Sequence, residues 1–296
     1  MAKQVTVAAT QMACGWDADG NIARGEKLVR QAAAQGAQII LLQELFEAPY
    51  FCIEQDPKHF ALASTVEESR LIQHFRQLAR ELQVVLPISW FERCHNAYYN
   101  SLVVIDADGS VLETYRKTHI PNGPAYQEKQ YFTPGDTGFK VWDTRYARIG
   151  VGICWDQWFP ETARSLALQG AELIFFPTAI GSEPDYPAID SQPHWTRTQQ
   201  GHAAANLTPV IASNRIGTES SLLHPDYRMT FYGSSFIADE TGELVQQADK
   251  TSECVLVHTF DLDAVRQRRV AWGVFRDRRP QMYDVLKTSD GIHQAV

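Results

Sequence analysis

A chain of 296 residues, 44% hydrophobic and 21% charged, can bury a large core and has the composition of an ordinary soluble globular protein. Its formal net charge of −8 argues against nucleic acid or an anionic membrane as a partner and is compatible with a cationic substrate. No apolar run is long enough to span a bilayer, and the chain begins in a strand pattern without a signal segment. The five cysteines are scattered and never spaced as C-x-x-C, which argues against a disulfide framework or zinc cluster and favours a reducing compartment, the cytoplasm.

Strand and helix patterns alternate through the first half of the chain. The run 37–42 (AQIILL) is apolar on both faces, which is typical of a strand in a sheet that is covered on both sides. Gly36 before it ends a helical pattern, and the stretch 106–109 (DADG) predicts the turn of a hairpin. The expected strands are 5–12, 37–42, 84–90, 100–106 and 111–116, and the expected helices are 21–35 and 66–82.

The second half repeats this design. Residues 35–42 (QGAQIILL) match residues 169–176 (QGAELIFF), and each copy follows a strand and a helix. Two β-α-β units of one design predict an α/β fold with two pseudo-symmetric sheets and helices outside, in a single domain spanning 1–296. Residues 270–296 lack a long amphipathic helix and are interpreted as an extended arm, laid on the body or on a neighbouring subunit. The expected strands here are 149–153, 171–177, 209–213, 233–238, 243–247 and 253–259, and the expected helices are 161–169 and 194–206.

Cys154 stands at the end of a strand pattern. Apolar residues alternate with glycines over 149–153, which is typical of a strand that a neighbouring segment approaches closely. Pro160 and Glu161 predict the first turn of a helix. A cysteine between the two elements is expected at an exposed sheet edge, near the positive end of a helix dipole, where the thiolate is favoured. The alternative is a buried structural thiol.

Glu44 and Lys117 also follow strand patterns. A carboxylate directly after the apolar run 37–42 is costly unless it is paired or lies in a cleft, and the alternative is an edge residue turned to solvent. Lys117 follows Arg116 in a strand pattern, in which adjacent side chains point to opposite faces. One of the two side chains therefore points inward, unless both are solvated. It opens a Pro-, Gly- and Asn-rich loop, 117–138, of a length typical of functional loops. With Cys154, these residues supply the nucleophile, base and cation that acyl transfer requires.

The motifs around these residues resemble those of the nitrilase superfamily of carbon–nitrogen hydrolases. They are LQELF at 42–46, YRKTHIP at 115–121 and GICWD at 152–156, and the resemblance extends from residue 5 to 283. It implies a four-layer α-β-β-α sandwich with two pseudo-symmetric halves. The segment 219–230 is the least similar. The stretches 121–139, 154–160, 178–184, 212–217 and 272–280 resemble the group within this superfamily that hydrolyses N-carbamoylputrescine.

The resemblance also implies roles for individual residues. Glu44 is then the general base, Lys117 stabilises the tetrahedral intermediate, Cys154 is the nucleophile, and Glu128 orients the lysine or the substrate. The Trp155 backbone N–H is expected as a second oxyanion donor. The implied reaction releases ammonia, forms a carbamoyl thioester and ends in CO2 and putrescine, within polyamine synthesis from arginine, in a homo-oligomer. No cofactor or metal is expected, because the nine histidines show no paired ligand spacing.

The far end of such a substrate is a primary ammonium, which calls for a carboxylate. Glu183, Asp185 and Asp190 form an acidic cluster on a Pro-rich loop, which either receives the ammonium or is simply solvated. Three aromatic residues either line an apolar slot for the methylene chain or belong to the core: Trp155, Trp158 and Tyr126. Four further polar residues are interpreted as structural: His119, His194, His202 and Arg215.

Three other interpretations stay open. The same triad serves a β-ureidopropionase, an N-carbamoyl amino-acid amidohydrolase or an aliphatic amidase. Enzymes that act on acids should present Arg or His to a carboxylate, so the acidic loop favours an amine. A non-catalytic interaction protein would have no need of an intact Glu44, Lys117 and Cys154. A thiol-redox protein would need a resolving cysteine close in sequence, which Cys154 lacks.

Overall fold

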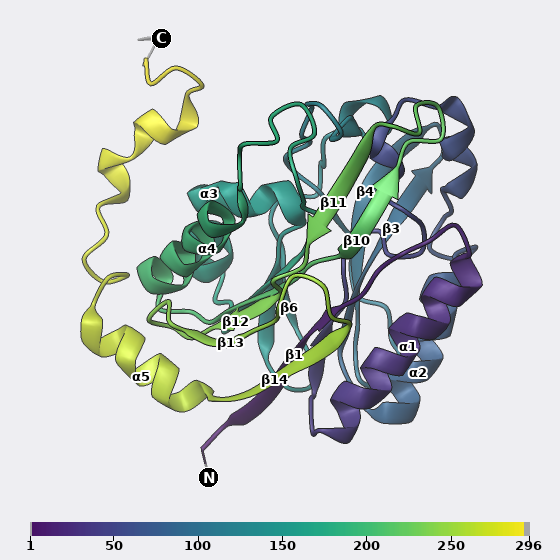
Figure 1. Ribbon diagram of the computed structural model, residues 1–296. Coiled ribbons are helices and arrows are strands. Elements are labelled where there is room, and N and C mark those ends of the chain that lie inside the picture. The colour runs from purple at the N-terminus through teal and green to yellow at the C-terminus, as the bar shows by residue number, and fades with distance from the viewer. Residues whose placement is uncertain (1, 293–296) are drawn as a thin grey trace.

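The N-terminal half builds most of one β-sheet in the structure, a computed structural model that describes residues 2–292. The sheet consists of two three-stranded parts. They are joined where the Ile40 N–H donates to the Val85 carbonyl at 3.0 Å. Helices α1 (Ala18–Ala34) and α2 (Arg70–Leu82) cover its outer face (Figure 1). The spatial order of the strands is β14 (Cys254–Asp261), β1 (Gln4–Gln11), β2 (Ile39–Leu41), β3 (Leu86–Cys94), β4 (Ala97–Ile105) and β5 (Tyr115–Arg116).

The second half builds the other sheet. Helices α3 (Pro160–Leu168) and α4 (Gln192–Asn206) cover its outer face, on the opposite side of the molecule from α1 and α2 (Figure 1). The chain also forms a hairpin, β10 (Ile216–Ser220) and β11 (Arg228–Tyr232), and a helix, α5 (Leu262–Trp272). The order of the sheet is β13 (Leu244–Gln247), β12 (Phe236–Ala238), β9 (Val210–Ser213), β8 (Leu173–Pro177), β7 (Arg148–Val151) and β6 (Val141–Asp143).

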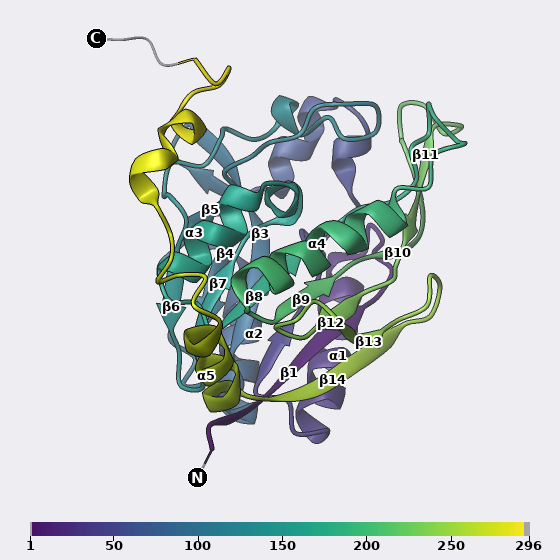
Figure 2. The same ribbon diagram turned by 90° about the vertical axis from the view of Figure 1, so that its left-hand side faces the viewer.

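The inner faces of the two sheets share one apolar core. Val7, Leu41 and Val104 from the first sheet belong to the same buried cluster as Phe175 and Ile211 from the second. With a pair of helices outside each sheet, the molecule has the four layers α-β-β-α (Figures 1 and 2). The strand orders of the two halves correspond, since β1, β2, β3 and β4 occupy the places of β7, β8, β9 and β12. The predicted sandwich with pseudo-symmetric halves is therefore confirmed.

The glycine pattern before Cys154 has the predicted cause. A Cβ on Gly150 would lie 2.9 Å from the Leu166 Cβ, and one on Gly152 would lie 2.8 Å from the Phe176 ring. Side chains longer than hydrogen would therefore push α3 and β8 away from β7. The close approach of α3 fixes the direction in which the chain leaves the strand at Cys154.

Most expected elements are present, but several boundaries and four elements differ. Helix α2 begins at Arg70 because the Ser69 side chain caps it, accepting from the Ile72 N–H at 3.2 Å. In the expected strand 111–116 only Tyr115–Arg116 pairs with β4 as a strand. Helix α5 was not predicted, because in its sequence only Leu262 and Val265 are buried and no apolar stripe results. Strands β6, β10 and β11 were not predicted either.

Beyond α5, the described C-terminal residues run past α3 and the C-terminal end of α4 (Figures 1 and 2). The Arg164 guanidinium of α3 lies over the Phe275 ring, 5.1 Å from its centroid, so the arm is laid on the body of the molecule. The arm begins inside α5 and continues as single 3-10 turns, and residues 293–296 of the predicted arm lie outside the described residues. Of the helices described here, none combines the length and the apolar character that crossing a bilayer requires.

Candidate active site

Cys154 follows β7 and opens the 3-10 turn Cys154–Trp158, with α3 beginning at Pro160 as expected. Its φ of +41° lies in the left-handed region, which costs a non-glycine residue about 1–3 kcal/mol. The side chain is only 5% exposed, so the expected exposed position at the sheet edge is wrong. Burial, together with the Glu44 carboxylate, raises the pKa of the Cys154 thiol well above its ordinary value, although Lys117 opposes this. A raised pKa favours the thiol over the thiolate, whereas the sequence position was expected to favour the thiolate.

Lys117 and two glutamates form a fully buried cluster. The Lys117 Nζ lies 2.8 Å from Glu44 Oε1 and 2.7 Å from Glu128 Oε2, and none of the three side chains is exposed to solvent. Burial alone would lower the pKa of Lys117, but the charges of Glu128 and Glu44 outweigh it and raise that pKa. The ammonium therefore stays charged, and its charge acts to lower the pKa of the Cys154 thiol. The alternatives left open by the sequence, a solvated Lys117 and a Glu44 turned to solvent, are therefore wrong.

The two oxygens of Glu44 differ in their surroundings. Oε1 accepts from Lys117 Nζ and, at 2.6 Å, from Asn100 Nδ2 of β4. Oε2 is buried and has no hydrogen-bond partner among the described residues. A buried carboxylate oxygen without a donor, whose charge also acts on the Cys154 thiol, is a group that can accept a proton.

Glu128, like Glu44, pairs with Lys117, and it also has a hydrogen-bond partner of its own. It lies in the 3-10 turn Glu128–Gln130 of the long loop 117–138, and the Tyr50 hydroxyl donates to its Oε1. Burial raises the pKa of Glu128 to about 7, while Lys117 acts to lower it. The arrangement fits a residue that holds the lysine in place.

Arg215 fixes the backbone that carries Glu44. Its guanidinium is fully buried, donates to the carbonyl oxygens of Glu44, Leu45 and Ala48, and pairs with Glu219 at 3.1 Å. The sequence analysis interpreted Arg215 as structural and did not connect it with Glu44. Neither the contact of Arg215 with Glu44 nor that of Asn100 with Glu44 could be found from sequence, because the partners are 171 and 56 residues apart along the chain.

A cavity of about 190 Å³ opens above Cys154. Tyr126, Trp155 and Trp158 line it, as expected for an apolar slot, and Glu183 lies at its wall. The Tyr126 hydroxyl accepts from the Gly181 N–H at 3.0 Å, so the loop 117–138 is tied to the segment that carries Glu183. Its remaining lining residues are Pro121, Asn122, Gly123, Pro124 and Ile180.

The structure separates the members of the acidic cluster. Glu183 is half-buried, and this burial raises the pKa of its carboxyl. Asp185 is exposed, does not line the cavity and interacts with Tyr227. Asp190 is exposed as well and lies 3.4 Å from Lys250. Of the three carboxylates, Glu183 is therefore the one placed to meet a molecule in the cavity.

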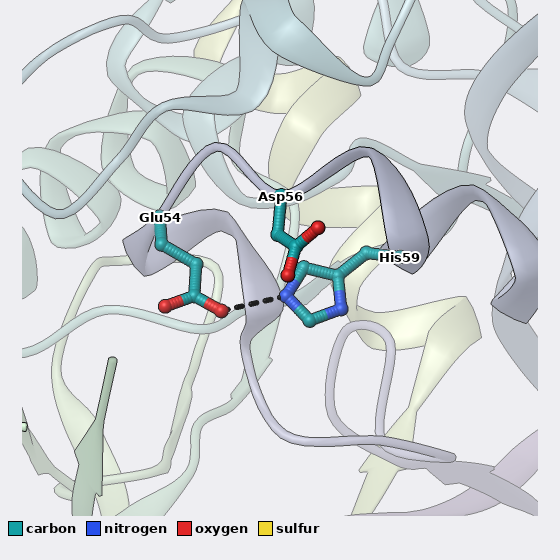
Figure 3. Close-up of side chains that lie close together, drawn as sticks. All are labelled: Glu54, Asp56 and His59. Atoms are coloured by element: carbon teal, nitrogen blue, oxygen red, sulfur yellow. Dashed lines mark hydrogen bonds and ion pairs between the residues drawn. The ribbon is translucent and has the colours of Figure 1, made fainter. Parts of the chain in front are cut away.

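Glu54, Asp56 and His59 bring three potential metal-ligand atoms within 4.8 Å of one another (Figure 3). The His59 Nε2 lies 2.8 Å from Glu54 Oε1, while Glu54 Oε2 accepts from the Ser221 hydroxyl and from the Leu223 N–H. Asp56 Oδ1 accepts from the Lys58 N–H and caps a 3-10 helix. Because these oxygens already have protein donors, the cluster acts as a tether between the chain around residue 54 and the tip of the β10–β11 hairpin.

Comparison with known proteins gives consistent matches over nearly the whole chain. A model of the family described as carbon-nitrogen hydrolase matches residues 6–270. The N-carbamoylputrescine amidase of Arabidopsis thaliana is 56% identical over 290 residues, 98% of this chain and 97% of the plant protein. The citrullinase of Francisella tularensis subsp. tularensis (strain SCHU S4 / Schu 4) is 53% identical over 282 residues, 95% of this chain and 98% of its own. The crystal structure of a carbon-nitrogen hydrolase from Helicobacter pylori G27 superposes with a TM-score of 0.90 at 38% identity, covering 97% of this chain and 99% of that one.

Proposed function

This chain belongs to the carbon–nitrogen hydrolase family, and we propose that it is an enzyme that hydrolyses N-carbamoylputrescine to putrescine, CO2 and ammonia. The observation that carries the proposal is that Cys154 and Glu183 line the same cavity. Lys117 and Glu44 lie beside the thiol, buried and paired. The family membership and the identity to N-carbamoylputrescine amidases support the same reaction.

In the first half-reaction, Cys154 attacks the ureido carbon. Its thiol proton passes to Glu44, whose Oε2 has no other donor among the described residues, and from Glu44 to the departing ammonia. Negative charge develops on the ureido oxygen, where the Lys117 ammonium and the Trp155 N–H stabilise it. The C–N bond to ammonia breaks, and a carbamoyl thioester on Cys154 remains.

In the second half-reaction, Glu44 takes a proton from water, which attacks the thioester carbon. The C–S bond breaks, and the proton returns to the thiolate, so that Cys154 is restored. The released carbamate decomposes to CO2 and the diamine. Because burial and the Glu44 charge raise the pKa of the Cys154 thiol, the attack needs a base to take the thiol proton, which supports the assignment of Glu44.

Glu183 is proposed to receive the distal ammonium of the substrate. Tyr126, Trp155 and Trp158 offer ring surface along the cavity, which suits a chain of methylene groups. No Lys, Arg or His side chain is among the residues described as lining this cavity. A cation at the far end of the substrate would offset the charge of Glu183, whose burial otherwise favours the neutral form.

Citrulline hydrolysis is the second candidate, because a citrullinase is 53% identical to this chain. Citrulline carries a carboxylate beside its distal ammonium. That carboxylate would lie in a cavity with Glu183 on its wall and without a lining cation, so like charges would repel. The cavity therefore favours the diamine derivative over the amino acid.

Ammonia release from purified protein tests the reaction. We expect turnover of N-carbamoylputrescine at a kcat/KM at least roughly 100-fold above that of citrulline or N-carbamoyl-β-alanine. C154A should release no ammonia from any of them. Preference for citrulline or the β-alanine derivative would overturn the putrescine assignment, and an active C154A would overturn the nucleophile.

Substitution of Glu183 tests the assigned ammonium site. Glu183→Gln keeps the shape of the side chain but removes its charge, so we expect KM for N-carbamoylputrescine to rise roughly 10- to 100-fold with a smaller change in kcat. Asp185→Asn, on the same loop but outside the cavity lining, is the matched comparison and should change KM less than about twofold. Equal effects of both substitutions would contradict a specific role of Glu183.

We further propose that the protein is a homo-oligomer in the cytoplasm. Support for the oligomer comes from the arm, where Val270 and Trp272 are 72% and 73% exposed and Leu286 is 63% exposed. Support for a reducing compartment comes from the five cysteines, which are all free.

A further inference from the structure

Asp156, two residues after Cys154, is a fully buried carboxylate that accepts four hydrogen bonds. Oδ2 accepts from the Ile153 N–H at 2.9 Å and from the Tyr115 hydroxyl at 2.7 Å. Oδ1 accepts from the His119 N–H at 3.0 Å and lies 2.8 Å from the His119 Nδ1. Two of the four donors are backbone groups, so the carboxylate fixes the main chain as well as side chains.

The donors come from the two segments that carry the proposed catalytic residues. Ile153 directly precedes Cys154 in the chain. Tyr115 and His119 stand two residues before and two residues after Lys117, so one carboxylate holds the lysine segment on both sides. The His119 ring also stacks on Phe159, with centroids 3.7 Å apart and planes 7° from parallel, which extends the connection to the start of α3.

The backbone between Ile153 and Asp156 needs such support. Cys154 has a φ of +41°, a conformation that a cysteine does not adopt without surrounding constraints. The Asp156 N–H donates to the Ile153 carbonyl at 3.0 Å, and the Ile153 N–H donates back to the Asp156 carboxylate. These two bonds close a small ring around Cys154 and hold the turn in the strained form.

We propose that Asp156 is a positioning residue for the hydrolysis, which sets the Cys154 Sγ against Lys117 and Glu44 by joining their backbones. The inference rests on the proposed roles of these three residues. Asp156 does not line the cavity, so it acts through the geometry of the nucleophile and leaves substrate binding intact.

Asp156→Asn is the decisive variant. Whichever way the amide faces, its NH2 group points at a backbone N–H, either that of Ile153 or that of His119, and one of the two loses its acceptor. We expect kcat for N-carbamoylputrescine to fall roughly 100-fold per folded site, as a displacement of about 1 Å would cause, with KM changed less than about threefold. Binding of the substrate to C154A and to C154A/D156N, measured by calorimetry, should agree within about threefold.

Asp239→Asn is the matched control. Asp239 Oδ1 also accepts from two backbone N–H groups, those of Thr241 and Glu243, but it lies in the turn between β12 and β13. With rates normalised to folded protein, D239N should keep wild-type kcat. If D156N keeps kcat within about threefold, or D239N loses as much as D156N, the proposal is overturned.

Two milder variants decide the question if D156N does not fold. Tyr115→Phe and His119→Phe each remove one side-chain hydrogen bond to Asp156 and leave its two backbone donors in place. We expect each to lower kcat, and the double variant to lower it further, without a change in KM. Wild-type kcat in the folded double variant would overturn the proposal.

If wild type instead prefers citrulline, the putrescine assignment fails, and the same kcat comparison is made on citrulline.

Discussion

Glu128 is a buried acid with a lysine as its charged partner. Because burial raises its pKa to about 7, its protonated form is favoured in the folded protein across a pH range in which an unfolded chain would ionise it. Folding therefore binds a proton at Glu128 between pH 4.5 and about 7. A group whose folded pKa is raised contributes stability that is fully present at low pH and is lost as the pH rises through the folded value.

We predict that the wild-type protein loses stability at this site as the pH rises from about 4.5 to about 7. The loss should be on the order of 1–3 kcal/mol, since one pKa unit corresponds to about 1.4 kcal/mol. Glu128→Gln removes the titrating group, so the free energy of unfolding of this variant should not show this decrease with pH. Urea unfolding of both proteins at a series of pH values measures the difference. The exposed Glu67→Gln is the control and should parallel the wild type. If the free energy of unfolding depends on pH in the same way in E128Q and wild type, the prediction is contradicted.

At the level of elements, the loop 117–138 carries Lys117 at its start, Glu128 in its middle and cavity-lining residues between them. Gly135 anchors its far end, because its N–H donates to the Lys117 carbonyl at 2.8 Å. A Cβ at this position would lie 2.0 Å from the Arg116 carbonyl oxygen and 2.7 Å from that of Lys117. The backbone there has no room for a side chain.

We predict that Gly135→Ala displaces the Lys117 segment. The free energy of unfolding should fall by about 1–3 kcal/mol, and kcat should fall more than the loss of folded protein explains. Gly201→Ala is the matched control, because a Cβ there meets nothing within 4 Å inside α4, and stability should stay the same or rise by about 0.5–1 kcal/mol. Thermal melting and initial rates measure both variants. Wild-type activity in G135A would show that the loop end is free to move.

Elements with strong periodic patterns could be predicted from sequence, and those without them could not. Strand β2 is continuously apolar because both its faces are covered, and α1 and α2 carry apolar stripes that pack on the first sheet. The hairpin β10–β11 alternates weakly, since Gly217 and Thr218 are exposed and one side packs on neighbouring loops. Its position depends on Glu54, which lies more than 160 residues away in sequence and holds its tip.

The same distinction applies to the site. Glu44, Lys117 and Cys154 stand at strand ends and within recognisable motifs, so the sequence predicted one site from them, and Glu44 and Lys117 do form a pair in the structure. Burial was not predictable, because it depends on how loops close over the strand ends, and the raised pKa of the Cys154 thiol follows mainly from that burial. Glu183 lines the cavity and Asp185 does not. This difference likewise depends on the path of the loop, which the pattern of charges in the sequence does not reveal.

For the whole molecule, we propose that residues 1–296 fold as one domain, since the central core takes residues from both sheets. We predict a single cooperative transition in scanning calorimetry, with loss of activity at the same temperature, because Glu44 and Cys154 come from different halves. Two separated transitions would show instead that each sheet unfolds with its own helices.

The arm leads to a prediction about assembly. Its exposed apolar side chains, Val270, Trp272 and Leu286, are expected to be covered by another copy of the chain. Light scattering should give a mass that is a multiple of 33.4 kDa, and V270D/W272D should lower it. Leu222→Asp, on the 57% exposed Leu222 beyond β10, serves as the control and should keep the wild-type mass. A wild-type mass of one chain would contradict the prediction.

The burial of Cys154 has a consequence for the survival of the enzyme under oxidative stress. Hydrogen peroxide attacks thiolates that are accessible, whereas Cys154 is 5% exposed and has a thiol pKa that burial and the Glu44 charge raise. In the proposed mechanism, Cys154 becomes a thiolate when its proton passes to Glu44. We therefore expect peroxide to oxidise Cys154 of the resting protein more slowly than it oxidises an accessible thiolate.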